Sequence, residues 1–129
     1  MPLITWKDEY SVENTTIDNQ HKKLIKLIND LHEGMRNRQG KTVLGKILDE
    51  LIEYTVVHFR DEEQIMEKNQ YPDLVPHKSR HNDLIEQVEA LKKKHDSGAI
   101  MLSLSTMDFL KSWLTDHILG VDKKYVPYI

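Results

Sequence analysis

Hydrophobic residues recur in alternating steps of three and four along most of the chain, and this spacing predicts amphipathic helices. Polar breaks divide the pattern into four segments that follow an irregular N-terminal arm of about 17 residues. The breaks are Asn37 to Gly40, Asn69 to Pro72 and Asp96 to Ala99. Asp18 and Ser105 are good N-caps, so we expect the first helix to open at Asp18 and the fourth at Ser105.

Short breaks between long helices place successive helices side by side and antiparallel. The sequence therefore predicts an all-α fold, an up-down-up-down four-helix bundle with an irregular N-terminal arm. We expect a single domain over residues 1–129, with the arm at about 1–17, the bundle at about 18–121 and a short C-terminal tail.

Histidines and a glutamate occupy positions on the buried helix stripes that leucine or isoleucine would otherwise fill. They are His21 in the first stripe, His58 and Glu62 in the second, His77 and His81 in the third, and His117 in the fourth. In an up-down-up-down bundle all six of these positions fall at the same end. Buried polar groups need partners, and residues four apart on a helix can present donors to one metal or to adjacent metals.

Asp122 lies five residues after His117, which on a regular helix turns it about 140° away from the histidine. Gly120 lies between them, and glycine tolerates the left-handed conformations that end helices. We therefore predict that the fourth helix loosens there and turns the Asp122 carboxylate back toward the histidines.

Composition narrows the chemistry to nitrogen and oxygen ligands. The chain has seven histidines and no cysteine, which excludes disulfides, iron-sulfur clusters and thiolate zinc sites. A net charge of -3 without a long basic run argues against nucleic acid as a partner. The chain shows neither a secretory signal nor an apolar run of roughly 20 residues, so we expect a cytoplasmic protein without membrane insertion.

The ordered set of these residues resembles the hemerythrin family, in its single-domain bacterial form. The resemblance rests on His21 in the first helix, H-x-x-x-E from His58, H-x-x-x-H from His77 and H-x-x-x-x-D from His117, and it runs from Trp6 almost to the C-terminus. Each motif alone is weak, whereas the ordered set is specific.

The resemblance implies a non-haem di-iron centre with an oxo or hydroxo bridge. By this resemblance His77, His81 and His117 bind one iron, His21 and His58 bind the other, and Glu62 and Asp122 bridge the two. Together these donors fill roughly eleven of the twelve positions around two octahedral ions, which leaves one open position on the iron with two histidines. By the same resemblance, a dioxygen pocket is walled by Leu24, Phe59, Trp113 and Leu114.

The implied function is reversible dioxygen binding for carriage, storage or delivery, rather than enzymatic turnover. No E-x-x-H motif of carboxylate-rich di-iron oxidases occurs in the chain. Three alternatives stay open: sensing of oxygen or redox state through a partner protein, a di-iron enzyme that reduces nitric oxide or peroxide, and a metal store. Dioxygen is the expected partner, the sequence does not identify a protein partner, and the chain is expected to be a monomer or a weak homo-oligomer.

Other polar residues are interpreted as structural. His32 and His95 match no ligand position, and His95 belongs to the far end of the bundle. Glu63 is expected to point off the buried stripe into solvent, and Asp18 is expected to cap a helix. The run Lys92 to Lys94 is expected to form an exposed face.

Overall fold

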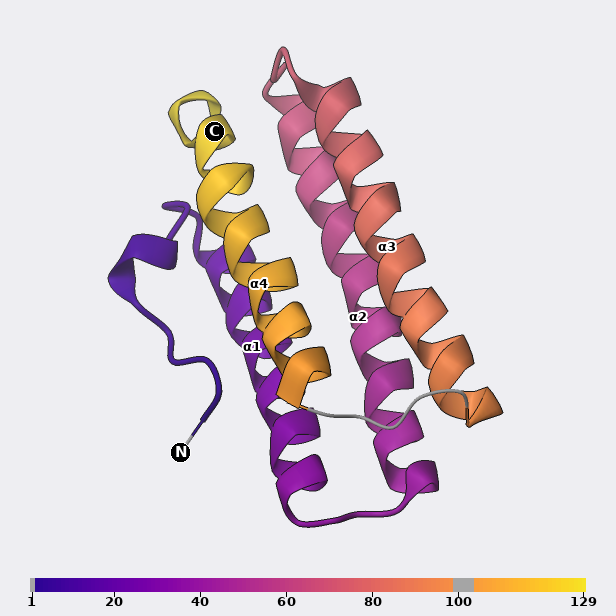
Figure 1. Cartoon of the computed structure of the whole chain (residues 1–129). Coiled ribbons are helices and arrows are strands. Elements are labelled where there is room, and N and C mark those ends of the chain that lie inside the picture. Colours follow the sequence, from indigo (N-terminus) through magenta and orange to yellow (C-terminus); the bar gives the residue numbers. More distant parts are fainter. Residues whose placement is uncertain (1, 99–103) are drawn as a thin grey trace.

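The computed structural model describes residues 2–98 and 104–129. Four long helices follow one another as α1 (Thr15–Arg36), α2 (Lys41–Lys68), α3 (Leu74–Ser97) and α4 (Leu104–Gly120), with short 3-10 helices η1 (Asp8–Tyr10) and η2 (Asp122–Tyr128) near the two ends. The long helices lie side by side and alternate in direction, which confirms the predicted four-helix bundle (Figure 1). Within the described ranges there is no strand, and no helix is both long and apolar enough to cross a membrane.

Helix α1 begins earlier than the sequence pattern predicts. Its N-cap is Asn14, whose side-chain oxygen accepts a hydrogen bond from the Ile17 amide at 3.0 Å. The Asp18 carboxylate, the predicted cap, instead accepts hydrogen bonds from the Val12 amide at 2.8 Å and the Ser11 hydroxyl at 2.6 Å. Asp18 therefore fastens the N-terminal arm to α1 while Asn14 starts the helix.

Helix α4 differs from the expected helix in where it starts and in the backbone conformation that ends it. It is already helical at Leu104, so Ser105 is not its N-cap, and the residue before Leu104 lies outside the described part of the chain, as does Ala99 of the third predicted break. The helix ends at Gly120, as predicted, but Gly120 does not have a positive φ, and a Cβ placed there would meet no atom within 4 Å. The direction changes instead at Val121, with φ -120° and ψ -55°.

Tyr125 explains why the chain turns at this point. Its side chain, 1% exposed, anchors η2 in a small apolar cluster with Val12, Ile17, Met66 and Tyr71. Burying an aromatic ring of this size removes a large apolar area from water. That burial pulls η2 back across the end of the bundle and carries Asp122 inward.

Two apolar layers enclose the histidine end of the bundle. The main core consists of inward residues from all four long helices, such as Leu24, Ile28, Leu48, Val88 and Leu110. The Tyr125 cluster forms a second layer at the end where α2 stops and α3 starts. Because the predicted site residues lie between these layers along each helix, apolar side chains cover them in both directions along the bundle axis.

Candidate metal centre

The structure brings all seven predicted site residues to one end of the bundle. That end is the upper one in Figure 1, where α1 starts, α2 ends, α3 starts and α4 passes into η2. Every one of the seven side chains is buried: His21, His58, Glu62, His77, His81, His117 and Asp122. His117, the most exposed of them, has only 7% of its surface accessible.

The ligand atoms fall into two overlapping groups, in each of which all donors lie within 4.8 Å of one another. One group contains Glu62, His77, His81, His117 and Asp122. The other contains His21, His58, Glu62 and Asp122. The two carboxylates are therefore shared, whereas the histidines divide into three and two. A carboxylate offers two oxygen atoms, so each shared side chain could contact two neighbouring cations.

Glu62 lies at the centre of both groups. Its Oε1 atom is 2.9 Å from Nε2 of His81 and 3.2 Å from Nε2 of His77. Its Oε2 atom is 3.4 Å from Nε2 of both His21 and His58. The Tyr125 hydroxyl also donates a hydrogen bond to Oε2, at 3.1 Å. One carboxylate from α2 thus contacts imidazoles of α1, α2 and α3.

Asp122 supplies the second shared carboxylate, as the predicted break after Gly120 requires. Its Oδ1 atom is 2.9 Å from Nε2 of His117 and 3.0 Å from Nε2 of His77. Its Oδ2 atom is 3.1 Å from Nε2 of His21. Because η2 starts a new turn at Asp122, the side chain points inward although it follows His117 by five residues.

The hydrogen-bond pattern of the cluster fits a bound cation. Nε2 of His21, Nε2 of His117 and both carboxylate oxygens of Asp122 are buried without a hydrogen-bond partner. Yet Nε2 of His21 lies 3.1 Å from Oδ2 of Asp122, and Nε2 of His117 lies 2.9 Å from Oδ1. These contacts have the length of hydrogen bonds but not their direction. An unsatisfied buried polar atom costs about 1 to 3 kcal/mol. Imidazole and carboxylate donors that converge in this way suit iron or a similar transition metal.

The charges of the cluster depend on one another. Burial lowers the pKa of His21 and His77, but close contact with Asp122 and Glu62 outweighs burial and raises each pKa to about 9. Burial raises the pKa of Glu62, but contacts with His21, His58, His77 and His81 hold the pKa well below its usual range. For Asp122, burial and Glu62 raise the pKa, whereas His117 and His21 lower it to below its ordinary value.

These shifts predict how the metal-free protein responds to pH. The raised pKa values of His21 and His77 stabilise the fold fully below pH 6.5, and this contribution is lost as pH rises through about 9. The lowered pKa values of Glu62 and Asp122 stabilise it above about pH 4.5. Thermal unfolding in the presence of a chelator should therefore show the highest melting temperature between about pH 4.5 and pH 6.5. In the metal-loaded protein the imidazoles are neutral, so its melting temperature should not fall as the pH rises toward 10. A melting temperature of the metal-free protein that stays level from pH 6 to 10 would contradict the raised pKa values of His21 and His77.

The four side chains predicted to wall a dioxygen pocket are all buried, namely Leu24, Phe59, Trp113 and Leu114. Phe59 stacks on His81, with ring centroids 3.8 Å apart and planes 2° from parallel. Leu24 follows His21 by one turn on α1, and Leu114 precedes His117 by one turn on α4. Apolar side chains therefore surround the histidine cluster on its inner side.

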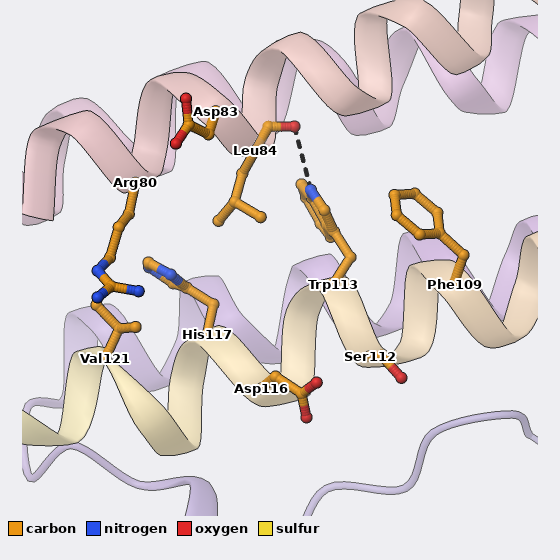
Figure 2. A pocket seen from close by; sticks show the side chains of 9 residues that line it. All are labelled: Arg80, Asp83, Leu84, Phe109, Ser112, Trp113, Asp116, His117 and Val121. Carbon is orange, nitrogen blue, oxygen red and sulfur yellow. Dashed lines mark hydrogen bonds between the residues drawn. The ribbon is translucent and has the colours of Figure 1, made fainter.

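Trp113 lies in the seam between α3 and α4, where a groove of about 370 Å³ opens to solvent. Figure 2 shows Trp113 and Phe109 toward one end of this groove and Arg80, His117 and Val121 toward the other. The Trp113 indole N–H donates to the Leu84 carbonyl at 3.1 Å, which ties α4 to α3 beside the groove. Trp113 is thus held in place in the wall of the groove.

Two residues that the sequence pattern did not assign to the site, Gln20 and Glu63, contact the Nδ1 atoms of His58 and His81. The Nδ1 atom of His81 is 2.7 Å from Oε2 of Glu63. Glu63 thus lies off the buried stripe, as predicted, but its side chain is only 24% exposed and contacts a histidine of the cluster instead of solvent alone. The Nδ1 atom of His58 is 2.7 Å from Oε1 of Gln20. The one sequence signal for the role of Glu63 was its place in the motif H-x-x-x-E-E, where a second acid directly follows the buried Glu62.

The remaining histidines lie outside the cluster. His95 is buried at the far end of α3, where its Nε2 atom is 3.0 Å from the Lys41 carbonyl. His32 is also buried, and it belongs to neither ligand group. Lys93 and Lys94 are exposed as predicted, whereas Lys92 is partly buried and pairs with Asp49 at 3.2 Å and Asp96 at 2.6 Å.

Comparison with known proteins identifies the family. The sequence profile of the hemerythrin HHE cation binding domain matches residues 13–129. The chain is 37% identical over 128 residues to a bacteriohemerythrin of Methylococcus capsulatus, an alignment that covers 98% of this chain and 97% of that protein. It is 33% identical over 120 residues to myohemerythrin-1 of Phascolopsis gouldii, covering 93% and 89%. A crystal structure of wild-type hemerythrin superimposes with a TM-score of 0.90 at 36% identity, covering 98% of this chain and 97% of that one. The chain therefore belongs to the hemerythrin family.

Proposed function

We propose that this protein binds dioxygen reversibly at a non-haem di-iron centre and serves in its carriage, storage or delivery. His77, His81 and His117 would hold one iron, and His21 and His58 the other. Glu62 and Asp122 would bridge the pair. The observation that carries the proposal is the division of the donors into a group with three histidines and a group with two, joined by the same two carboxylates.

The unequal groups support binding of a small ligand at one side. Octahedral iron takes six donors, and the group around His21 and His58 supplies one imidazole fewer than its neighbour. Room for a diatomic ligand is therefore expected beside these two histidines. When bound, the iron pair supplies the electrons and the coordination position that dioxygen needs.

The surrounding residues favour a cycle that ends in release rather than in irreversible oxidation. Leu24, Phe59 and Leu114 are buried and present carbon atoms, which keep water and its protons away from a bound ligand. Tyr125 is a buried phenol, and burial together with Glu62 and Asp122 raises its pKa, so its proton stays in place and holds Glu62. The phenol itself therefore contributes no change of charge while ligand enters and leaves.

Leu114 provides a test of water exclusion. A Leu114→Ser variant should lose its oxygenated form to the ferric state on the order of tenfold faster, because a hydroxyl admits water to the site. The decay of the visible absorption band at constant temperature measures this rate. Leu119, which is 41% exposed on the same helix, offers a matched control, since Leu119→Ser makes the same chemical change at the surface. Equal lifetimes for the two variants would remove Leu114 from the shielding role.

Anaerobic loading with ferrous iron followed by air is the experiment that tests the proposal as a whole. The expected result is a visible band that appears with oxygen and disappears under vacuum over repeated cycles. A centre that instead consumes oxygen or peroxide continuously when an electron donor is supplied would be an enzyme, and the proposal would then be wrong.

A further inference from the structure

Three successive acidic residues of α2, Asp61, Glu62 and Glu63, contact three different parts of the bundle. Successive residues of a helix are about 100° apart, so Asp61 and Glu63 flank the inward-pointing Glu62 on opposite sides. Glu63 contacts His81 of α3, and Asp61 contacts Gln20 of α1. The run therefore places one carboxylate inside the cluster and one on each side of it.

Glu63 determines which nitrogen of His81 carries the proton. An ionised carboxylate can only accept hydrogen bonds, so the 2.7 Å contact requires a proton on Nδ1 of His81. The Nε2 lone pair is then free to face the cluster, where this atom lies 2.9 Å from Glu62. His81 is fully buried and the Glu63 side chain is 24% exposed, so the charge of Glu63 acts on the site through a single hydrogen bond.

The corresponding contact of His58 passes through a neutral amide. The Gln20 amide donates through Nε2 to Oδ2 of Asp61 at 2.8 Å, which turns its Oε1 toward His58. This oxygen can only accept, so Nδ1 of His58 must donate the 2.7 Å hydrogen bond, and Nε2 of His58 is again free for the cluster. Here the carboxylate charge lies one side chain farther from the imidazole than it does at His81.

We propose that Glu63 and the Gln20–Asp61 pair are positioning residues that fix the orientation of His81 and His58 and make the two halves of the centre electronically unequal. The proposal rests on the proposed di-iron function. A carboxylate that accepts the outer N–H of a histidine makes the inner nitrogen a stronger donor. The half with three histidines therefore receives additional negative charge directly from Glu63, whereas the half with two receives it only through an amide.

As a consequence, the half of the centre that contains His81 should favour ferric over ferrous iron. Additional negative charge stabilises ferric iron more than ferrous iron, so Glu63 lowers the reduction potential of the centre. Glu63→Gln removes the charge but keeps an oxygen that can accept from His81. Asp61→Asn removes a charge of the same size at the relayed position, and Glu67→Gln removes one from an exposed position on the same helix.

The test compares the three variants in two measurements. The midpoint potential of the iron-loaded protein should rise in Glu63→Gln, rise less in Asp61→Asn and stay at the wild-type value in Glu67→Gln. Each tenfold change in the ratio of ferric to ferrous affinity corresponds to about 59 mV for a one-electron couple. The affinity of the metal-free protein for zinc, measured by competition with a chelator, should fall about tenfold in Glu63→Gln and further in Glu63→Ala, which has no acceptor for His81.

The result that overturns the inference is a Glu63→Gln protein whose potential and zinc affinity equal those of Glu67→Gln. A rise in potential no larger than that of Asp61→Asn would also overturn it, since the direct and relayed contacts would then be equivalent. Failure of the wild-type protein to bind oxygen is a different result. It contradicts the proposed function, whereas the zinc measurement still tests whether Glu63 positions His81.

Discussion

A Glu62→Ala variant is expected to lose both irons under conditions in which the wild-type protein takes up about two per chain. The two ligand groups share Glu62, and its oxygens lie 2.9 to 3.4 Å from Nε2 atoms of four histidines. Removing it takes a negative charge away from both halves at once, whereas the loss of a single histidine weakens one half. Iron quantitation after anaerobic loading and desalting measures the effect.

Two further variants separate charge from shape at this position. Glu62→Gln keeps the size of the side chain and its acceptor oxygen but lacks the charge, so it should also bind iron poorly. Glu67→Ala, on the exposed side of α2, should keep the wild-type iron content. Circular dichroism of the metal-free proteins checks that each variant remains helical. A folded Glu62→Ala protein with about two irons per chain would exclude Glu62 as the shared ligand.

The second large effect concerns stability rather than metal binding. Leu48→Ala should lower the free energy of unfolding by about 3 kcal/mol, because Leu48 is fully buried in the main core and its truncation leaves a cavity. That loss corresponds to a melting temperature lower by about 10 °C for a domain of this size. Denaturant unfolding of the metal-free protein gives the free energy directly.

The same variant should leave the metal centre unchanged. Leu48 precedes His58 by ten residues on α2, which is roughly 15 Å along the helix axis. The iron content and the spectrum of the oxygenated form should therefore match the wild type below the melting temperature. Val43→Ala, at an exposed position of the same helix, provides the control for stability. Equal unfolding free energies for Leu48→Ala and Val43→Ala would contradict the assignment of Leu48 to the core.

The inward faces of the helices could be predicted from sequence because they follow a simple periodicity. His58 and Glu62 are separated by four residues, as are His77 and His81, so each pair must share a face whatever the neighbouring helices do. The antiparallel topology then fixes which helix ends meet. These two facts suffice to bring the histidines together, and the structure places them accordingly.

The sides of the helices could not be predicted in the same way, since a residue there has a partner only if the adjacent helix supplies one. Glu63 reads as solvated from its own helix alone, yet His81 of α3 lies 2.7 Å from it. Asn14 and Asp18 are equally good caps by residue type, and the contact of Asp18 with Val12 decides between them. Gly120 marked the right position for the turn of the chain, but the burial of Tyr125 accounts for it.

Anaerobic titration of the metal-free protein with ferrous iron, followed by cycles of air and vacuum, shows whether the bundle holds two irons that bind oxygen reversibly. We expect saturation at about two irons per chain and a visible band that forms in air and is lost under vacuum, with the reduced protein recovered each time. Saturation at a clearly different ratio, or a reduced protein that takes up two irons and no oxygen, would contradict the proposed function.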